Sequence, residues 1–303
     1  MTIRLFVQRF AALLLFFIVM VSCSSAPKKP AAVYTDRNMA VNQLDLANRM
    51  ANQGRYEDAL MILGDARRLA VSVDDPPLLI RTSIAYGNLL FSLGSHSEAF
   101  GHWESALVEA ESSGERDLAA LAHIYAARGR LMLIGNFASG NEAEEIRNQV
   151  NGFISSIRSD ILAQAAGYLV LGMAEKELGR YAEAERAVRR ALDIHEKNLY
   201  LEEAAYDWFF IASIFSVAGR YDDALAALQT AIDFDRRAEN GFGLASSWQA
   251  MGEVYQKKSA AAVNAGSDRI NAVRAFLRAA EIYRAIGLYE AAQNAEARAA
   301  AIN

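Results

Sequence analysis

The stretch Ala205–Asp235, AYDWFFIASIFSVAGRYDDALAALQTAIDFD, decides how this chain of 303 residues folds. It divides at Gly219 into two halves, and in each half apolar residues recur at three- and four-residue steps, which predicts two amphipathic helices. The residues with this spacing are Trp208, Ile211, Ala212, Phe215, Ala224, Leu228 and Ala231. Neither helix could bury its apolar face alone, so each must pack against its partner and against neighbouring units.

The same pattern returns along the chain at a regular interval. Hinge glycines stand at Gly54, Gly94, Gly135, Gly179 and Gly219, which gives spacings of 40, 41, 44 and 40 residues. A fixed period of this length predicts a stacked helical array, in which each unit completes the core of the next. We therefore predict an all-α solenoid over residues 38–303, with about six helix pairs and a C-terminal capping helix after Gly287.

Short motifs within the units resemble those of tetratricopeptide repeats (TPRs). Trp248-x2-Met251-Gly252-x2-Tyr255 matches the W-x2-L-G-x2-Y part of the repeat, and Ala99-x3-Trp103 matches A-x3-F. This resemblance covers about residues 38–302 and implies a right-handed superhelix whose concave face holds peptides or partner helices. The period of about 40 residues, in place of 34, is similar to the longer-helix subclass of cytoskeletal and signalling adaptors.

Small residues mark where two helices of one unit must approach closely. We expect the hinge glycines to adopt the left-handed conformation that ends a first helix. Alanines recur five residues after the hinge, where a larger side chain would overpack, so Ala224→Leu should destabilise more than Ala227→Leu on the adjacent face. These alanines are Ala59, Ala99, Ala184 and Ala224. Ser95 and Asp75, the latter followed by Pro76, are predicted helix N-caps.

The first 22 residues differ in kind from the repeats. Arg4 and Arg9 precede an uncharged apolar run, residues 10–21, which is the layout of a secretory leader. As a helix this run would span roughly 18 Å, against about 30 Å of bilayer hydrocarbon. We therefore expect residues 1–22 to be a cleaved signal peptide. The alternative is an uncleaved anchor that is lengthened through Leu5 and Phe6.

The apolar run ends at Met20-Val21-Ser22-Cys23, and Cys23 is the only cysteine of the chain. This segment resembles the lipobox of bacterial lipoproteins, although leucine is usual where Met20 stands. The resemblance implies that Cys23 is acylated, for example with palmitate, and becomes the first mature residue. Residues 23–37 then form a flexible tether, and the absence of aspartate after Cys23 favours the outer membrane, facing the periplasm.

Charge and motifs argue against several other functions. Removal of residues 1–22 leaves 29 basic and 36 acidic side chains, a net charge of −7, which disfavours a nucleic-acid partner. No histidine is followed at an i+3 or i+4 step by a second ligand that would build a metal face, so we expect no metal or other cofactor beyond the lipid on Cys23. The four histidines, expected to be solvent-exposed or capping, are His96, His102, His123 and His195. No catalytic motif is found, and the chain is not expected to be an enzyme.

The resemblance to TPR proteins also implies which side chains face the concave groove. The principal candidates for peptide binding are Asn48, Asn52, Asn88, Phe91, Tyr125, Met173, Tyr206 and Phe209. Further positions on this face are Leu44, Met132, Lys176, Ser213, Gln249, Glu253 and Gln256. The alternative for each is packing between units. Within the aromatic run of the fifth unit, we expect Tyr206 and Phe209 to face the groove and Trp208 to pack between helices.

These observations predict a membrane-anchored TPR adaptor or scaffold that binds a protein or peptide segment in its concave groove, in envelope assembly. A related alternative is an assembly factor for pilus or outer-membrane proteins. A different class is an accessory component of a solute transporter that encloses a small ligand. A closed pore lined by Tyr125, Met173 and Phe209 would favour the transporter component, and an open groove would favour a peptide.

Overall fold

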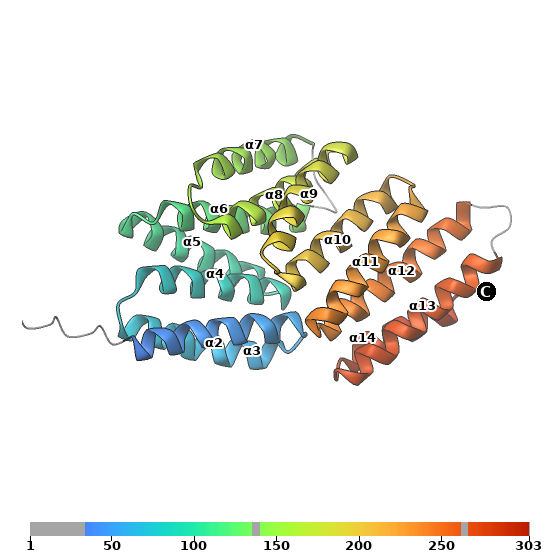
Figure 1. Cartoon of the computed structure of the whole chain (residues 1–303), viewed down its shortest axis with the longest axis horizontal. Coiled ribbons are helices and arrows are strands. Elements are labelled where there is room, and N and C mark those ends of the chain that lie inside the picture. Colours follow the sequence, from blue (N-terminus) through green and yellow to red (C-terminus); the bar gives the residue numbers. More distant parts are fainter. Residues whose placement is uncertain (1–33, 135–139, 262–265, 303) are drawn as a thin grey trace, which may run out of the picture. The chain divides into compact units, whose positions relative to one another are not determined.

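The computed structural model describes residues 34–134, 140–261 and 266–302. The chain divides into two units, residues 1–35 and 36–303, and the second unit is described by itself. Thirteen helices and no strand occur in these described ranges (Figure 1). They are α2 (Thr35–Asn52), α3 (Tyr56–Ser72), α4 (Pro76–Ser92), α5 (His96–Ser113), α6 (Arg116–Ile134), α7 (Gly140–Ser156), α8 (Ile161–Glu177), α9 (Tyr181–Lys197), α10 (Leu201–Val217), α11 (Tyr221–Ala238), α12 (Gly241–Ala261), α13 (Gly266–Ala285) and α14 (Tyr289–Ala300).

The helices form six consecutive pairs, α2–α3 to α12–α13, followed by α14, so the predicted all-α repeat fold is confirmed. The pairs follow one another in chain order, as the colours of Figure 1 show. Gly54, Gly94, Gly179 and Gly219 have φ angles of 77°, 82°, 72° and 76°, the left-handed conformation that ends a first helix. Gly135 lies outside the described residues. The array begins at Thr35, three residues before the predicted boundary.

A second set of glycines explains why the repeat motif pairs a glycine with a large residue. A Cβ atom on Gly252 in α12 would lie 2.9 Å from the ring of Phe276 in α13. A Cβ on Gly172 would lie 2.4 Å from Val188, the equivalent residue of the α8–α9 pair. The bulky side chain of each second helix therefore fills the space that the glycine of the first helix leaves.

The alanines after the hinges are buried as predicted. Ala59, Ala99, Ala184 and Ala224 are all 0% exposed. However, Ala227 is also buried, at 3% exposure. The prediction that Ala227 lies on a face where a leucine would destabilise less is therefore wrong. Ala227 lies three residues from Ala224, and the apolar face of α11 is wide enough to include both positions.

Ala224→Leu should therefore be compared with Ala226→Leu, because Ala226 is exposed on the same helix. We expect Ala224→Leu to lower the free energy of unfolding by about 1 to 3 kcal/mol through overpacking, and Ala226→Leu to change it by less than about 0.5 kcal/mol. Urea denaturation followed by circular dichroism measures both values. Equal losses would show that α11 does not pack in this register.

Of the two predicted N-caps, only one makes the expected hydrogen bond. The Asp75 carboxylate accepts a hydrogen bond of 3.1 Å from the Leu78 backbone N–H at the start of α4. Ser95 occupies the N-cap of α5, but its side chain makes no capping bond. The Glu98 carboxylate in the first turn of α5 still interacts favourably with the positive end of the helix dipole.

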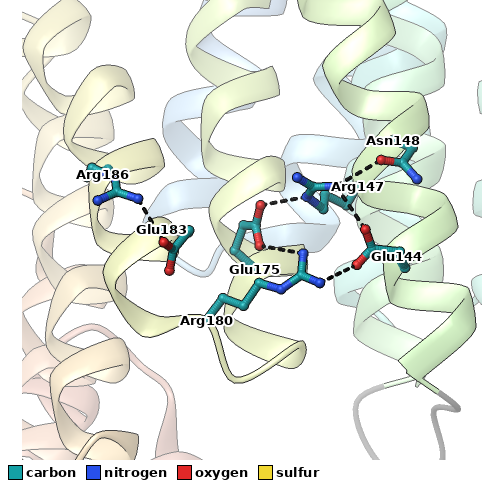
Figure 2. A network of polar contacts seen from close by, with 7 residues as sticks. All are labelled: Glu144, Arg147, Asn148, Glu175, Arg180, Glu183 and Arg186. Atoms are coloured by element: carbon teal, nitrogen blue, oxygen red, sulfur yellow. Dashed lines mark hydrogen bonds and ion pairs between the residues drawn. The ribbon is translucent and has the colours of Figure 1, made fainter.

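An ion network around the buried carboxylate of Glu175 joins the third unit to the fourth (Figure 2). The Glu175 side chain of α8 is 7% exposed and lies between Arg147 of α7, at 2.7 Å, and Arg180 after α8, at 3.5 Å. Glu144 pairs with both arginines at 2.9 Å, which closes a ring of alternating charges. Only the Glu175 carboxylate is buried, so loss of both of its arginine partners would leave that charge uncompensated, and the network fixes α7 against α8.

Candidate partner-binding surface on α10

The first helices of different units meet through polar side chains on the inner side of the array. Arg128 of α6 donates a hydrogen bond of 3.3 Å to the Tyr206 hydroxyl of α10, and its guanidinium lies 5.6 Å from the centre of that ring. These two helices belong to units three and five, which are not neighbours in the chain. Their contact therefore shows that Tyr206 faces inward, toward the other first helices.

The aromatic side chains of α10 divide between two surroundings. Tyr206 is 37% exposed, and its ring centre lies 6.3 Å from that of the half-buried Phe209. Phe210, one turn after Tyr206, is 8% exposed. We call Tyr206, Phe209 and Phe210 the α10 inner face.

Trp208 points away from this inner face and packs on the preceding unit. Its indole N–H donates a hydrogen bond of 3.2 Å to Glu196 of α9, and the Arg189 guanidinium lies 5.5 Å from the ring centre. The geometry therefore separates Trp208 from Tyr206, as the sequence predicts. Phe209 also packs on the main apolar core, so Tyr206 is the most accessible aromatic of the three.

The other aromatic and methionine candidates lie in packed surroundings. The Phe91 ring stands 4.5 Å from His96 and 5.7 Å from Trp103, between the helices of its own unit. Tyr125 packs against the main core, and Met173 belongs to that core at 9% exposure. Packing therefore accounts for the positions of these three side chains.

The three asparagine candidates differ in their surroundings. Asn48 is exposed and Asn88 is half-buried. The Asn52 side chain donates a hydrogen bond to Glu202, in the first turn of α10. Asn52 therefore already has a partner from a distant repeat.

The first repeat also contacts the sixth helix pair and the start of α14. A Cβ atom on Gly54 would lie 2.8 Å from Leu288 and 3.3 Å from Phe242. The Tyr56 ring packs edge-on against Phe242, with the ring centres 6.4 Å apart. The hinge of the first repeat therefore packs against α12 and the start of α14, which belong to the last part of the array.

Two lysines of the neighbouring first helices contact α10, one at the Phe210 ring of the inner face and the other at Ser216. The Lys176 ammonium of α8 lies 5.2 Å from the centre of the Phe210 ring, and Lys257 of α12 donates a hydrogen bond of 3.2 Å to the Ser216 hydroxyl. The sequence marked Lys176 as an inner position but gave no signal for Arg128 or Lys257. Their convergence depends on how successive units rotate, which no local pattern encodes.

Buried polar groups occupy the contacts between later units, and one of them corrects the expectation for the histidines. His195 is buried, and its Nδ1 lies 2.6 Å from the Asp207 carboxylate. Burial raises the pKa of Asp207 to about 6, against the opposing effect of its hydrogen bond with His195. The other three histidines contact aromatic rings: His102 stacks on Tyr86 and His123 on Phe153, and His96 packs at a tilted angle against Phe91. Apolar contact, more than solvation, determines where these rings lie.

Two further findings bear on the kind of site. Among residues 34–134, 140–261 and 266–302, no helix is long and apolar enough to cross a membrane. In these same ranges, no group of three or more histidine, cysteine or acidic side chains is placed to hold a metal ion.

The repeat architecture and its inward-facing first helices define the class of helical-repeat scaffolds. Residues 165–199 match the tetratricopeptide repeat family, and the described part of the chain has the all-α fold of tetratricopeptide-repeat solenoids. No curated protein sequence matches the chain.

Two solved structures share the fold at low sequence identity. One is a Rap protein complexed with competence and sporulation factor, with a TM-score of 0.57 and 15% identity, covering 87% of this chain and 74% of that one. Another is a signal transduction ATPase with numerous domains from Pyrococcus horikoshii that has a tetratricopeptide repeat sensor. It has a TM-score of 0.55 and 14% identity, covering 89% of this chain and 44% of that one.

Proposed function

We propose that this chain is a membrane-anchored adaptor of the bacterial cell envelope, which binds a segment of a partner protein against the α10 inner face. The observation that carries the binding role is the position of Tyr206. This large aromatic side chain is 37% exposed although it faces the inside of the array. Amphipathic aromatic residues in such positions supply much of the binding energy of protein interfaces.

The fold supports the same role, because a stacked array presents a long inner surface to a partner. The Rap protein, which shares this fold, was crystallised with a bound factor. A non-enzymatic scaffold fits the absence of a catalytic motif in the sequence.

The solute-transporter alternative required a pore lined by Tyr125, Met173 and Phe209. Of these three residues Met173 is buried at 9% exposure, which does not favour that alternative, whereas Tyr125 and Phe209 are half-buried. A role in the assembly of pilus or outer-membrane proteins remains compatible with the proposal, since such a protein would also bind a segment of its partner.

The anchoring part of the proposal rests on Cys23, which lies outside the described residues. Cys23→Ser should abolish fatty-acid labelling and leader cleavage, because the thiol is the acceptor of the lipid. Each buried CH₂ group contributes about 0.8 kcal/mol to membrane binding, so loss of the acyl chains should release the protein from membranes. Metabolic labelling and membrane fractionation measure these effects, with Ser24→Ala as control. If Cys23→Ser still incorporates labelled fatty acid, the protein is not a lipoprotein of this kind.

The binding part can be tested at Tyr206. A photo-crosslinking amino acid at position 206 should capture one recurrent partner protein in cells, identified by mass spectrometry. Tyr206→Ala should then lower the affinity for that partner about thirtyfold, because a buried interface aromatic contributes about 2 kcal/mol. Phe209→Ala is a less selective variant, since its ring also packs on the core.

The matched control is Tyr289, which is 65% exposed at the start of α14. A crosslinker at position 289 should capture no recurrent partner, and Tyr289→Ala should bind normally. Both tyrosine variants should keep the wild-type circular dichroism spectrum. Equal binding by Tyr206→Ala and the wild type would place the partner on another surface.

A further inference from the structure

We propose that the first repeat acts as an autoinhibitory latch, which closes over the start of the α10 inner face and opens to admit a partner segment. We define the latch as the contact of Asn52, Gly54 and Tyr56 with Glu202, Phe242 and Leu288. The inference rests on the proposed function, because it adds a regulation of the surface that binds the segment.

Gly54 differs from the other glycines of positive φ in the described part of the chain. Gly94, at the equivalent hinge of the second repeat, is exposed, and its Cβ would meet nothing beyond its chain neighbours within 4 Å. The same holds for the glycines at positions 114, 179, 219 and 287. Gly54 is buried, because Leu288 and Phe242 approach it. Its burial therefore comes from the far end of the array and not from the hinge itself.

The latch is a small contact between two ends that each have a core of their own. Tyr56 packs on the apolar cluster of the first repeat, and Phe242 and Leu288 pack on the cluster of the last repeat. All three side chains remain half-buried where they meet. The two ends can therefore separate without loss of either cluster, as in a local opening of low free energy.

The ends of a repeat array are also the parts whose separation changes most when the array flexes. Each repeat contacts its neighbours through a fixed interface, and small changes at successive interfaces add up along the chain. Gly54 and Leu288 are separated by five helix pairs, so a slight rotation at each interface is enough to part them. The latch therefore has two arrangements, closed and open, that differ little within any one repeat.

Glu202 connects the latch to the α10 inner face. It accepts the hydrogen bond from Asn52 and stands four residues before Tyr206, so the two side chains lie one turn apart on the same side of α10. In the closed latch, Asn52 therefore occupies the surface next to the accessible tyrosine. A segment that extends along α10 from Tyr206 toward the start of the helix must displace the first repeat.

The first test inserts a polar side chain into the latch of the full chain. Gly54→Asn places an amide against Leu288 and Phe242, and asparagine tolerates the left-handed conformation better than most residues. Gly94→Asn is the matched control, because its φ of 82° is close to the 77° of Gly54 and no distant side chain covers it. The two substitutions share the backbone strain, so only Gly54→Asn should open the latch.

The distance between the two ends measures this opening. Nitroxide labels at Glu57→Cys and Glu290→Cys, both exposed in the first turns of α3 and α14, suit double electron–electron resonance. Cys23→Ser in the same chain removes the only native thiol. The protein without further change and Gly94→Asn should show one short distance, and Gly54→Asn should show a longer one.

The second test asks whether the latch controls access to the inner face. Tyr206→Cys, again with Cys23→Ser, is labelled with a bulky maleimide-polyethylene glycol reagent. Adding Gly54→Asn should raise the labelling rate at least about tenfold, because an open state that is a minor population becomes the main one. Adding Gly94→Asn should leave the rate unchanged. Labelling of Ala226→Cys, exposed on α11, should be the same with and without Gly54→Asn.

The outcomes separate this inference from the proposed function. Equal spin-label distances with and without Gly54→Asn in a folded protein would overturn the latch, and so would an equal opening by Gly94→Asn. Opening without faster labelling of Tyr206→Cys would show that the contact does not cover the inner face. Segment binding at Tyr206 would stand in each of these cases. Failure to capture a partner at position 206 would instead contradict the proposed function alone, since neither test uses a partner. Circular dichroism shows whether each variant is folded.

Discussion

Trp103→Ala should destabilise the array by about 3 to 5 kcal/mol, as expected when a buried aromatic is truncated in a packed core. Trp103 is 3% exposed in α5 and is enclosed by glycines of two other helices. A Cβ atom on Gly87 of α4 would lie 2.3 Å from its Nε1, and one on Gly129 of α6 would lie 2.5 Å from its Cζ3. Because both glycine backbones approach the indole, neither can supply a side chain to fill the cavity.

The measurement is urea unfolding combined with hydrogen exchange of α4, α5 and α6, because units of a repeat array can unfold separately. The control is Trp208→Ala, which should cost less since Trp208 is only half-buried. Trp103→Phe should also cost less than alanine. It preserves most of the ring and removes an indole N–H that is buried without a hydrogen-bond partner. A larger loss for Trp208→Ala than for Trp103→Ala would contradict the packing described for α5.

Asp235→Asn should make the protein more stable than wild type at pH 8, with an advantage that shrinks toward pH 5. Asp235 of α11 is 1% exposed and accepts a hydrogen bond of 2.9 Å from Asn240. Burial raises its pKa from 3.8 to about 7, the hydrogen bond from Asn240 opposes the rise, and the charge of Glu202 adds to it. The neutral carboxyl group is therefore the form that the fold favours, and asparagine imitates it.

The raised pKa of Asp235 determines how the stability of the wild type changes with pH. A carboxyl group with a higher pKa in the folded protein takes up a proton on folding, so its stabilising effect is complete below about pH 4. That effect is lost as the pH rises through about 7. Between pH 5 and 7 the wild type should lose about 1.4 kcal/mol per pH unit relative to Asp235→Asn, or about 3 kcal/mol in total.

Urea unfolding of both proteins at several pH values between 5 and 8 measures this difference. Asp207, whose pKa is also raised, remains in both proteins, so the comparison isolates Asp235. The matched control is Asp233→Asn on the exposed side of α11, which should follow the wild-type pH dependence. A constant difference between Asp235→Asn and wild type across this pH range would show that Asp235 is ionised in the fold.

Asp207 and Asp235 are enclosed between consecutive units, where no partner can reach them. Substitution of these buried acids should therefore change stability.

The sequence by itself determined the helices, their pairing and the hinges. An apolar period of 3.6 residues and a glycine with positive φ are local features, so every unit shows them independently of its neighbours. The contact between a motif glycine and a bulky residue, as between Gly252 and Phe276, also lies within one helix pair. The secretory and lipidation predictions, which fall on residues 1–23, come from the sequence alone.

Only the tertiary structure decided which side chains meet across units. Met173 and Phe91 occupy positions that face a groove in the family, yet here they pack, because neighbouring side chains fill the space around them. The approach of Arg128 to Tyr206 and the closure of Gly54 against Leu288 join units that are far apart in the chain. These contacts depend on the sum of the small rotations between successive units, and the sequence of a single repeat does not determine that sum.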